Sequence, residues 1–525
     1  MVSAVKTIIS TLSRMERMVF TGIAMTSVLS GSFFGASAFT NATQIVPQNG
    51  GTYREGVVGQ PIHLNPLLVN GNDADHDIVR LVFSPLSAVA ETMEASKDGR
   101  TWIIRVPEGA RWQDGAPLTS DDILFTIQKV QDPATQSPFI ASWRGIIAER
   151  KSELEIALTL AAPYAFFEER ARDLFIIPKH VWEAIPPENW RLSNYTLEPV
   201  GSGPYAFESY KKQRDGFITE YNLVRNERYA VARPHIAEFQ FKFYREIEGE
   251  IEAFNTGAID GFGGTRLPLG DIYRRHDVFT FPTSRYYAIF FNQLTNDALK
   301  KAPVREALAA AIDRSRLLSA VLDGNGIAVD GPVPPTLRGY DRAAAAGAAA
   351  DLSAENLSFD LIVPQTDFLI KTAELVKADW KDIGVDTNVI VLNTNDINTE
   401  IIQTRNYHML LFGNVLKTDP DLFSFWHSSQ RFAPGLNLSL YESKTADGLI
   451  ETIRQTRDED ARMRKLATLQ ATIRRDAPAA FLYSPHYTYV SSKLDGGFPR
   501  GAIVTPSDRF ANVGEWYINT KRVLR

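Results

Sequence analysis

The 525-residue chain contains no cysteine. This absence excludes disulfides, thiolate metal sites, a cysteine nucleophile and the lipid-modified cysteine that anchors many secreted bacterial proteins. Histidine is also scarce: the eight histidines lie at positions 63, 76, 180, 235, 276, 408, 427 and 486. No two of them have the spacing of a zinc-binding pair. We therefore predict no metal site and no cofactor.

The chain also lacks an excess of charge of either sign. Its 56 basic and 62 acidic residues give a formal net charge of -6, so it has no basic surplus to hold nucleic acid. Hydrophobic residues make up 44% and aromatic residues 11% of the chain, which excludes general disorder. A chain of this length predicts roughly three domains of about 150 residues each.

Long apolar runs are absent except near the N-terminus, where residues 18–39 carry no charge and follow basic residues at positions 6, 14 and 17. This arrangement is typical of a targeting segment. Small residues at 36 and 38 form an A-x-A pattern, which predicts cleavage of a signal peptide after Ala38. The same run is long enough to span the ~30 Å hydrocarbon core as an uncleaved anchor. Both alternatives place residues 45–525 outside the cytoplasm.

Several segments have clear helix or strand patterns. Residues 304–322 have apolar residues at helical spacing between Pro303 and Gly324, which predicts one helix. Residues 357–392 read as a strand, an amphipathic helix and a second strand, a β-α-β succession. Thr119, with an acidic residue three positions later, predicts a capped helix start. The alanine-rich tract 343–350 predicts a surface loop or short helix without chemistry.

Motifs for catalysis or cation binding are missing or incomplete. Asp73, Asp75 and Asp77 resemble the start of a calcium loop, but Ile78 stands where glycine is required and Ser84 where glutamate is required. We expect a solvated loop there. An S-x-x-K sequence at 209–212 lacks the companion motifs of a serine acylase, and there is no G-x-S-x-G. We therefore predict no catalytic residues and no enzyme.

Six segments in order along the chain resemble landmarks of a known family. They include the block ending in WQDGAPLTSDDILFTIQKVQDP, the strand entry GSGPYAF, the turn RNERY, the helix-to-strand element FNTGAIDG, the block containing VREALAAAIDRSRL, and the closing DAPAAFLYSP. Their ranges are 98–133, 201–207, 225–229, 254–261, 290–317 and 476–485. In this order they resemble the oligopeptide-, dipeptide- and nickel-binding proteins of ABC importers, solute-binding protein family 5.

The resemblance implies an α/β architecture, the class II fold of periplasmic binding proteins, with two lobes joined by a hinge and an extra inserted domain. It implies four parts. The first is an N-terminal signal or anchor at 1–44, and the second is one lobe from 45–90, 200–288 and 487–525. The third is the extra domain at 91–199, and the fourth is the other lobe at 289–486. The hinge crossings are expected near 290–292 and 484–486.

The same resemblance implies an extracytoplasmic receptor that encloses a solute between its lobes. Relatives that bind peptides meet the ligand's amino terminus with an acidic residue after a strand that matches Phe412–Gly413 here. Aligned on that strand, the tryptophan position is Asn414 and the acidic position falls near Lys417. Asp419 is then the alternative amine contact, or it caps a helix that begins near Pro420.

Other candidate ligand-binding residues follow from the same layout. Asn292 and Tyr287 flank the expected hinge. Trp426 lies one to two turns beyond Asp419, with core packing as its alternative role. Trp143 and Arg144 of the extra domain are candidates to face the cleft, or else form a stack on the surface.

The predicted partners are a peptide-like or related small solute and the transmembrane subunits of an ABC permease, with ATP hydrolysed by separate subunits. Nucleic acid is not among them, and a monomer is expected. The alternative function is an extracytoplasmic hydrolase or chaperone-like protein on the same scaffold. Some relatives carry nickel or haem, but the few histidines offer little support for either.

Overall fold

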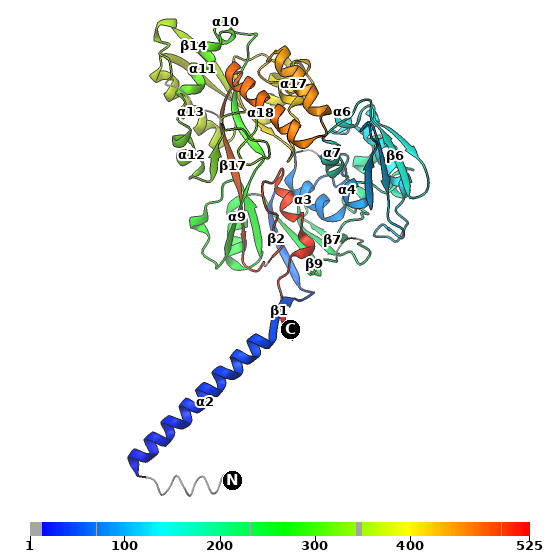
Figure 1. The fold of residues 1–525 in the computed structure, drawn as a ribbon, viewed down its shortest axis with the longest axis vertical. Coiled ribbons are helices and arrows are strands. Elements are labelled where there is room, and N and C mark those ends of the chain that lie inside the picture. The colour runs from blue at the N-terminus through cyan, green and yellow to red at the C-terminus, as the bar shows by residue number, and fades with distance from the viewer. Residues whose placement is uncertain are drawn as a thin grey trace.

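The computed structural model describes residues 13–69, 71–229, 231, 233–342, 349–494 and 496–524. Most of the alanine-rich tract, residues 343–348, lies outside the described residues. The body has two lobes and an extra domain, and one long helix projects from it (Figure 1). This is the expected α/β architecture.

Strand β17 (Ala479–Ser491) runs through both lobes. Its first part pairs with lobe II, and its second part, from His486 onward, pairs with lobe I. The lobe I strands that join it directly or through neighbours are β10 (Gly261–Gly264), β2 (Thr52–Val58), β9 (Glu238–Tyr244), β8 (Ile218–Arg225), β7 (Tyr205–Lys212) and β11 (Asp277–Pro282). Those of lobe II are β12 (Arg285–Phe291), β16 (Met409–Val415), β14 (Leu357–Pro364), β15 (Val385–Leu392) and β13 (Gly326–Ala328).

The chain changes lobe at two adjacent places. One is within β17, at Pro485–His486, where we expected a crossing. The other is Thr283–Ser284, between β11 and β12, whereas we expected it near residues 290–292. The two crossings are bonded to each other, since the Thr283 hydroxyl donates to the Pro485 carbonyl at 2.6 Å. The crossing at Thr283–Ser284 was misplaced because the apolar run of β12 begins earlier than the F-N motif suggested.

Lobe II contains the β-α-β unit expected from its sequence. Strands β14 and β15 pair in parallel, and helix α13 (Asp367–Asp382) connects them. The other helices of this lobe are α10 (Asp297–Lys300), α11 (Ala302–Ala311), α12 (Arg314–Leu322), α14 (Thr394–Asp396), α15 (Ile402–Thr404), α16 (Phe423–Trp426), α17 (Lys444–Gln455) and α18 (Glu459–Asp476).

The single helix predicted over 304–322 is wrong, because the chain breaks at Asp313 into α11 and α12. The Asp313 carboxylate accepts hydrogen bonds from the backbone N–H groups of Ser315 and Arg316, both at 3.0 Å. An aspartate in this role starts a new helix rather than continuing the old one.

The extra domain is built on an antiparallel sheet of β3 (Thr92–Ala95), β4 (Thr101–Arg105), β6 (Glu155–Thr159) and β5 (Ile147–Arg150). Its helices are α5 (Ser120–Gln131), α6 (Ile140–Trp143), α7 (Phe167–Asp173) and α8 (Lys179–Trp182). The predicted cap is present: the Thr119 hydroxyl and the Asp122 carboxylate form a reciprocal capping box at the start of α5.

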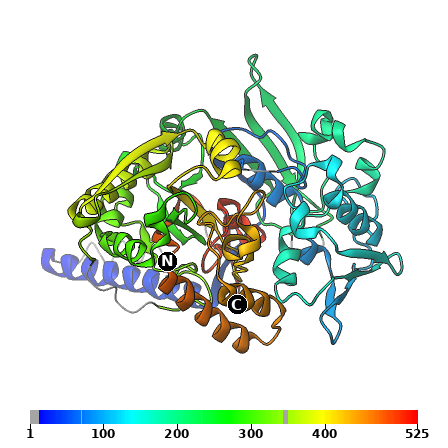
Figure 2. The same ribbon diagram turned by 90° about the horizontal axis from the view of Figure 1, so that it is seen from above.

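Buried apolar residues form one cluster shared by lobe I and the extra domain, a smaller cluster within lobe I, and separate clusters in lobe II. The shared cluster contains Tyr53 of lobe I together with Trp102 and Phe167 of the extra domain. Two clusters lie within lobe II, apart from one extra-domain residue, Phe166. Lobe I and the extra domain therefore pack as one body, which faces lobe II across the interlobe contact (Figure 2).

Lobe I has the helices α3 (Asp73–Val82), α4 (Leu86–Val89) and α9 (Ile247–Thr256). Helix α3 corrects the expectation of a solvated loop at residues 73–77. The Asn72 side chain caps it, and Asp75 and Asp77 are buried. The two buried acids have different partners, since Asp75 accepts from the Ile62 backbone and Asp77 from the Arg509 guanidinium, which an i, i+2 pattern alone did not reveal.

Helix α2 (Arg14–Ala42) leads directly into β1 (Thr43–Pro47), which pairs antiparallel with the C-terminal strand β18 (Thr520–Leu524). The described large apolar side chains of α2 are exposed, among them Phe33 and Phe34 at 73% each. Among the described helices, residues 14–34 of α2 are long and apolar enough to cross a membrane, a property that signal sequences share.

Candidate ligand-binding cleft

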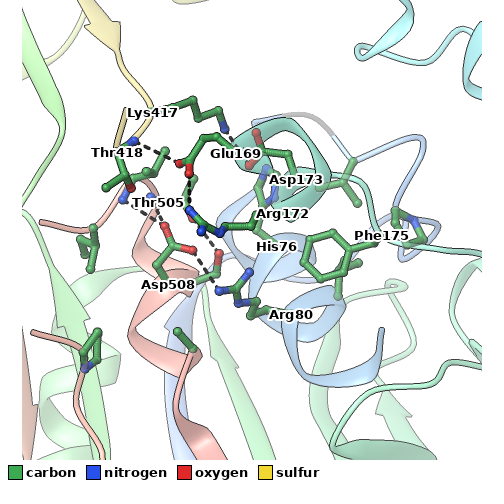
Figure 3. A pocket seen from close by; sticks show the side chains of 18 of the residues that line it. His76, Arg80, Glu169, Arg172, Asp173, Phe175, Lys417, Thr418, Thr505 and Asp508 are labelled. Carbon is green, nitrogen blue, oxygen red and sulfur yellow. Dashed lines mark hydrogen bonds and ion pairs between the residues drawn. The ribbon is translucent and has the colours of Figure 1, made fainter. Parts of the chain in front are cut away.

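A cavity of about 280 Å³ lies where lobe I, the extra domain and lobe II meet. Lobe I contributes α3 and the segment 499–511, the extra domain contributes the end of α7, and lobe II contributes Lys417 and Thr418. Charged side chains surround it: His76, Arg80, Glu169, Arg172, Asp173, Lys417 and Asp508 (Figure 3). A charged interlobe cavity of this kind is where a small polar ligand would be enclosed.

Helix α3 supplies one wall because its ends are tightly held. Near its start, the Asp75 carboxylate accepts hydrogen bonds from the backbone of Ile62 at 2.6 Å and of His63 at 3.2 Å. These bonds fix the buried face of the helix. His76 and Arg80, on the opposite face, then point into the cavity.

Three of the family-like motifs converge on the C-terminal end of α3. The amide of Gln113, from the W-Q-D-G turn, donates to the carbonyls of Val82 and Tyr205 and accepts from Gly201. Gly203 of the G-S-G-P-Y entry donates its N–H to Val82 at 2.8 Å. A Cβ at Gly201 would lie 1.9 Å from the Val82 oxygen, so only glycine fits this approach.

The R-N-x-x-Y turn supports these contacts with α3, since the Asn226 amide donates to the Gly203 carbonyl at 2.8 Å. These three family-like motifs thus have a structural role here. They hold the helix that lines the cavity rather than lining it themselves.

A buried ion network fixes α3 against the C-terminal segment. The guanidinium of Arg509, which is 2% exposed, contacts the Asp77 carboxylate at 2.6 Å and the Glu55 carboxylate at 2.7 Å. Arg509 lies in the 3-10 helix Pro506–Phe510, next to Asp508 of the cavity wall. Burial raises the pKa of Asp77 to about 7, against the opposing effect of Arg509.

Ion pairs and hydrogen bonds cross the cavity from the extra domain to lobe II. Lys417 Nζ lies 3.1 Å from an Asp173 carboxylate oxygen. The backbone N–H of Thr418 donates to Glu169 at 3.2 Å, and Arg172 donates to the same carboxylate at 2.7 Å. The charge of Lys417 is therefore matched by an acid from α7.

The remaining charged groups belong to lobe I. Arg80 lies 3.6 Å from Asp508, whose second oxygen accepts hydrogen bonds from the backbone of Val504 and Thr505. Burial lowers the pKa of His76, and the negative charge of Asp73 opposes this shift. Burial also raises the pKa of Asp173, which Lys417 opposes. The cavity thus offers cations, carboxylates and an imidazole together.

The predicted site residues lie elsewhere, and none of the seven is among those that line this cavity. Asn414 is buried and donates to the Tyr286 hydroxyl at 2.9 Å. Tyr287 packs against Tyr483 within lobe II. Asn292, at the end of β12, is fully buried and donates to the Arg405 carbonyl. Trp426 is buried against Phe481.

Asp419 lies 3.7 Å from Arg462 of α18. Asp419 does not provide the expected helix cap, because the next helix, α16, begins at Phe423 and its N-cap residue Leu422 makes no side-chain cap. In the extra domain, Trp143 is buried next to Phe167, whereas Arg144 is exposed. The structure therefore does not bring the predicted residues together around one cavity.

The sequence reasoning missed the α3 and α7 residues of the cavity. The available signal was the acidic pattern at 73–77, where a helix buries two of its carboxylates. Lys417 was noticed, but only as a departure from the family pattern. Among the described residues, no group of three His, Asp or Glu side chains is placed to hold a metal ion.

Comparison with known proteins identifies the family. The profile of the bacterial extracellular solute-binding proteins, family 5 (middle), matches residues 84–433, which is most of the chain. The chain belongs to this family. Its members are solute-binding receptors, so this protein is an extracytoplasmic solute-binding receptor rather than a hydrolase.

Individual relatives agree with this assignment. The chain is 24% identical to the oligopeptide-binding protein AppA of Bacillus subtilis, over 84% of this chain and 87% of that protein. The substrate-binding protein CtaP of Listeria monocytogenes has a similar structure, with 23% identity, a TM-score of 0.78, and coverage of 90% of this chain and all of that one. The structure of AppA with a nonapeptide has a TM-score of 0.73 at 22% identity, with the same coverage.

Proposed function

We propose that this receptor captures a small peptide or a peptide-like solute in the charged cavity and delivers it to an ABC permease. The observation that carries this proposal is the cavity itself, where cationic and anionic side chains from three parts of the chain meet. A peptide-like solute has opposite charges at its two ends, and such a set of side chains matches both.

The size of the cavity favours a small ligand. At about 280 Å³ it is at the low end of the range of roughly 300–1,000 Å³ that is usual for small-molecule sites. One relative, AppA, was crystallised with a nonapeptide. The cavity described here has room for a much shorter ligand.

Delivery would take place outside the cytoplasm. We propose that the chain is exported by its N-terminal segment and then either released by cleavage after Ala38 or retained by α2. Cleavage there leaves strand β1 intact, because β1 begins at Thr43. We further propose that the receptor acts as a monomer, with the domain boundaries inferred from the sequence except that the first change of lobe lies at Thr283–Ser284.

Mass spectrometry of ligand released from denatured protein tests this proposal directly. We expect an intact solute of at most a few residues, and we expect a mixture of di- and tripeptides to raise the melting temperature. The substitution Lys417→Met removes one charge that faces the cavity and is expected to weaken retention by about tenfold, which is ~1.4 kcal/mol. The control Lys377→Met alters a lysine of α13 that does not line this cavity.

Three results would contradict the proposal. Release of cleaved peptides would indicate an enzyme. Absence of any bound solute, together with no thermal shift from the peptide mixture, would exclude small peptides as the ligand. Equal retention by Lys417→Met and by its control would place the ligand elsewhere.

A further inference from the structure

Two neighbouring phenylalanines of the extra domain are buried in different hydrophobic clusters. Phe167, at the start of α7, packs against Trp102 at a centroid distance of 4.7 Å and belongs to the cluster of lobe I and the extra domain. Phe166, which is 4% exposed, belongs to a cluster of lobe II. The chain thus inserts one aromatic side chain across the boundary between two parts that must separate for the cleft to open.

Polar contacts surround this insertion. The Tyr164 hydroxyl donates to the Asp421 carboxylate of lobe II at 2.9 Å, and Arg454 of α17 donates to the same carboxylate at 3.1 Å. The N–H of Ala165 donates to the Arg454 carbonyl at 2.7 Å. One carboxylate of lobe II therefore holds both a hydroxyl of the extra domain and a guanidinium of its own lobe.

Arginines of lobe II also lie over the rings of this segment. The guanidinium of Arg454 is 5.2 Å from the centroid of the Tyr164 ring, and that of Arg462 is 5.4 Å from the Phe166 ring. Arg457, between α17 and α18, donates to the carbonyl of Ser96 in the turn between β3 and β4. The contact surface thus extends from the rim of the cleft to the sheet of the extra domain.

We propose that the segment Tyr164–Phe166 is a latch, by which the extra domain holds lobe II in the closed form independently of the ligand. The inference rests on the proposed function, since a latch matters only if the cleft opens to admit a solute. None of Tyr164, Phe166, Asp421 and Arg454 lines the cavity, so the latch and the ligand site can be altered separately.

The latch has a consequence for binding. Contacts that favour the closed form without ligand raise the apparent affinity, because the ligand no longer supplies all of the free energy of closure. They also slow opening, and hence release to the permease. The extra domain therefore sets the balance between capture and release.

The distance between the lobes provides a direct test, and the chain suits it because it has no native cysteine. Spin labels are placed on Leu192→Cys of the extra domain and Leu294→Cys of lobe II, whose native side chains are 83% and 51% exposed. Distances are measured by pulsed electron paramagnetic resonance on the full-length protein. Bound solute is first removed by unfolding in guanidinium chloride and refolding.

We expect the labelled parent protein to be mainly closed, and Phe166→Ala and Arg454→Met to shift the closed-to-open ratio toward open by about tenfold. Tyr164→Phe, which removes only the hydroxyl, is expected to shift it less. The control Arg316→Met breaks the pair of Arg316 with Asp379, which joins α12 to α13 inside lobe II and does not cross the cleft. It should leave the distances unchanged.

Identical distance distributions in the parent and in folded Arg454→Met and Tyr164→Phe would overturn the latch, as would a parent protein that is already open. Since these two variants keep the aromatic core, the test stands even if Phe166→Ala fails to fold. No ligand enters the measurement. Failure to find a bound peptide would therefore count against the proposed function alone.

Discussion

Gly201 shows how a single residue position can control the cleft without touching a ligand. A methyl group there would be 1.9 Å from the Val82 carbonyl, at the end of α3. We expect Gly201→Ala to displace this end of the helix, to cost roughly 1–3 kcal/mol of unfolding free energy, and to reduce ligand retention. Thermal unfolding and mass spectrometry of retained ligand measure the two effects.

Gly270 offers the matched control for this substitution. It lies in the same lobe, and a Cβ there meets no atom within 4 Å. Gly270→Ala should leave both stability and ligand retention unchanged. An equally stable Gly201→Ala protein would show that α3 is not held by this close approach.

A second prediction at the residue scale concerns Glu250, which is 1% exposed in lobe I. Burial, reinforced by the charge of Glu55, raises the pKa of this carboxyl to about 8. Its pKa in the unfolded chain is ~4.3. Between these values the folded state binds one more proton than the unfolded state, so the free energy of unfolding falls as pH rises.

The slope from this group is at most ~1.4 kcal/mol per pH unit. We expect Glu250→Gln to flatten the pH dependence of urea unfolding between pH 5 and 8, and to make the protein more stable than the parent at pH 8. Glu252, an exposed neighbour on the same helix, is the control, and Glu252→Gln should preserve the parent slope. A parent protein whose stability does not fall over this range would refute the assignment.

At the scale of elements, the break between α11 and α12 depends on the cap provided by Asp313. Removing such a cap typically costs ~1 kcal/mol. Asp313→Ala is therefore expected to lower the unfolding free energy by about that amount, as measured by denaturant titration. Asp382→Ala, at the exposed C-terminal end of α13, removes an acid without removing a cap and should cause no loss.

Elements governed by local chemistry were predictable from the sequence. The β-α-β unit of residues 357–392 follows from hydrophobic periodicity, and the start of α5 follows from Thr119 and its capping partner. The break at Asp313 was missed because the apolar pattern continues across it. The pattern does not record that a carboxylate competes with the helix for backbone N–H groups.

The cleft was much less predictable, for a reason of geometry. Its charged groups come from α3, α7, the loop after β16 and the C-terminal segment, which are far apart in sequence. No local pattern brings Lys417 beside Asp173, 244 positions earlier. The family motifs were visible because they are contiguous. Their role, to support α3, became clear only when Gln113, Gly201 and Asn226 were seen together in space.

At the scale of the whole molecule, helix α2 is separate from the body. Its described apolar side chains, such as Met18 and Leu29, are 69% and 67% exposed. A protein that begins at Phe39 is therefore expected to have the same melting temperature as the full chain. A protein that begins at Gln48 also loses β1 and its pairing with β18, and should melt roughly 1–2 °C lower.

Calorimetry of the three proteins separates these effects. A melting temperature that falls already with the protein starting at Phe39 would mean that α2 supports the body. Mass spectrometry of the chain isolated from its native host decides in parallel whether α2 is cleaved or kept.

The pairing of β1 with β18 brings the C-terminal strand beside the point where α2 joins the body, at one pole of lobe I and remote from lobe II (Figure 1). Any attachment made through either end, whether a membrane helix, a fused reporter or a sensor surface, therefore leaves lobe II free to swing. A receptor fixed in this way would report solute capture as a movement of its distant half toward the attached one.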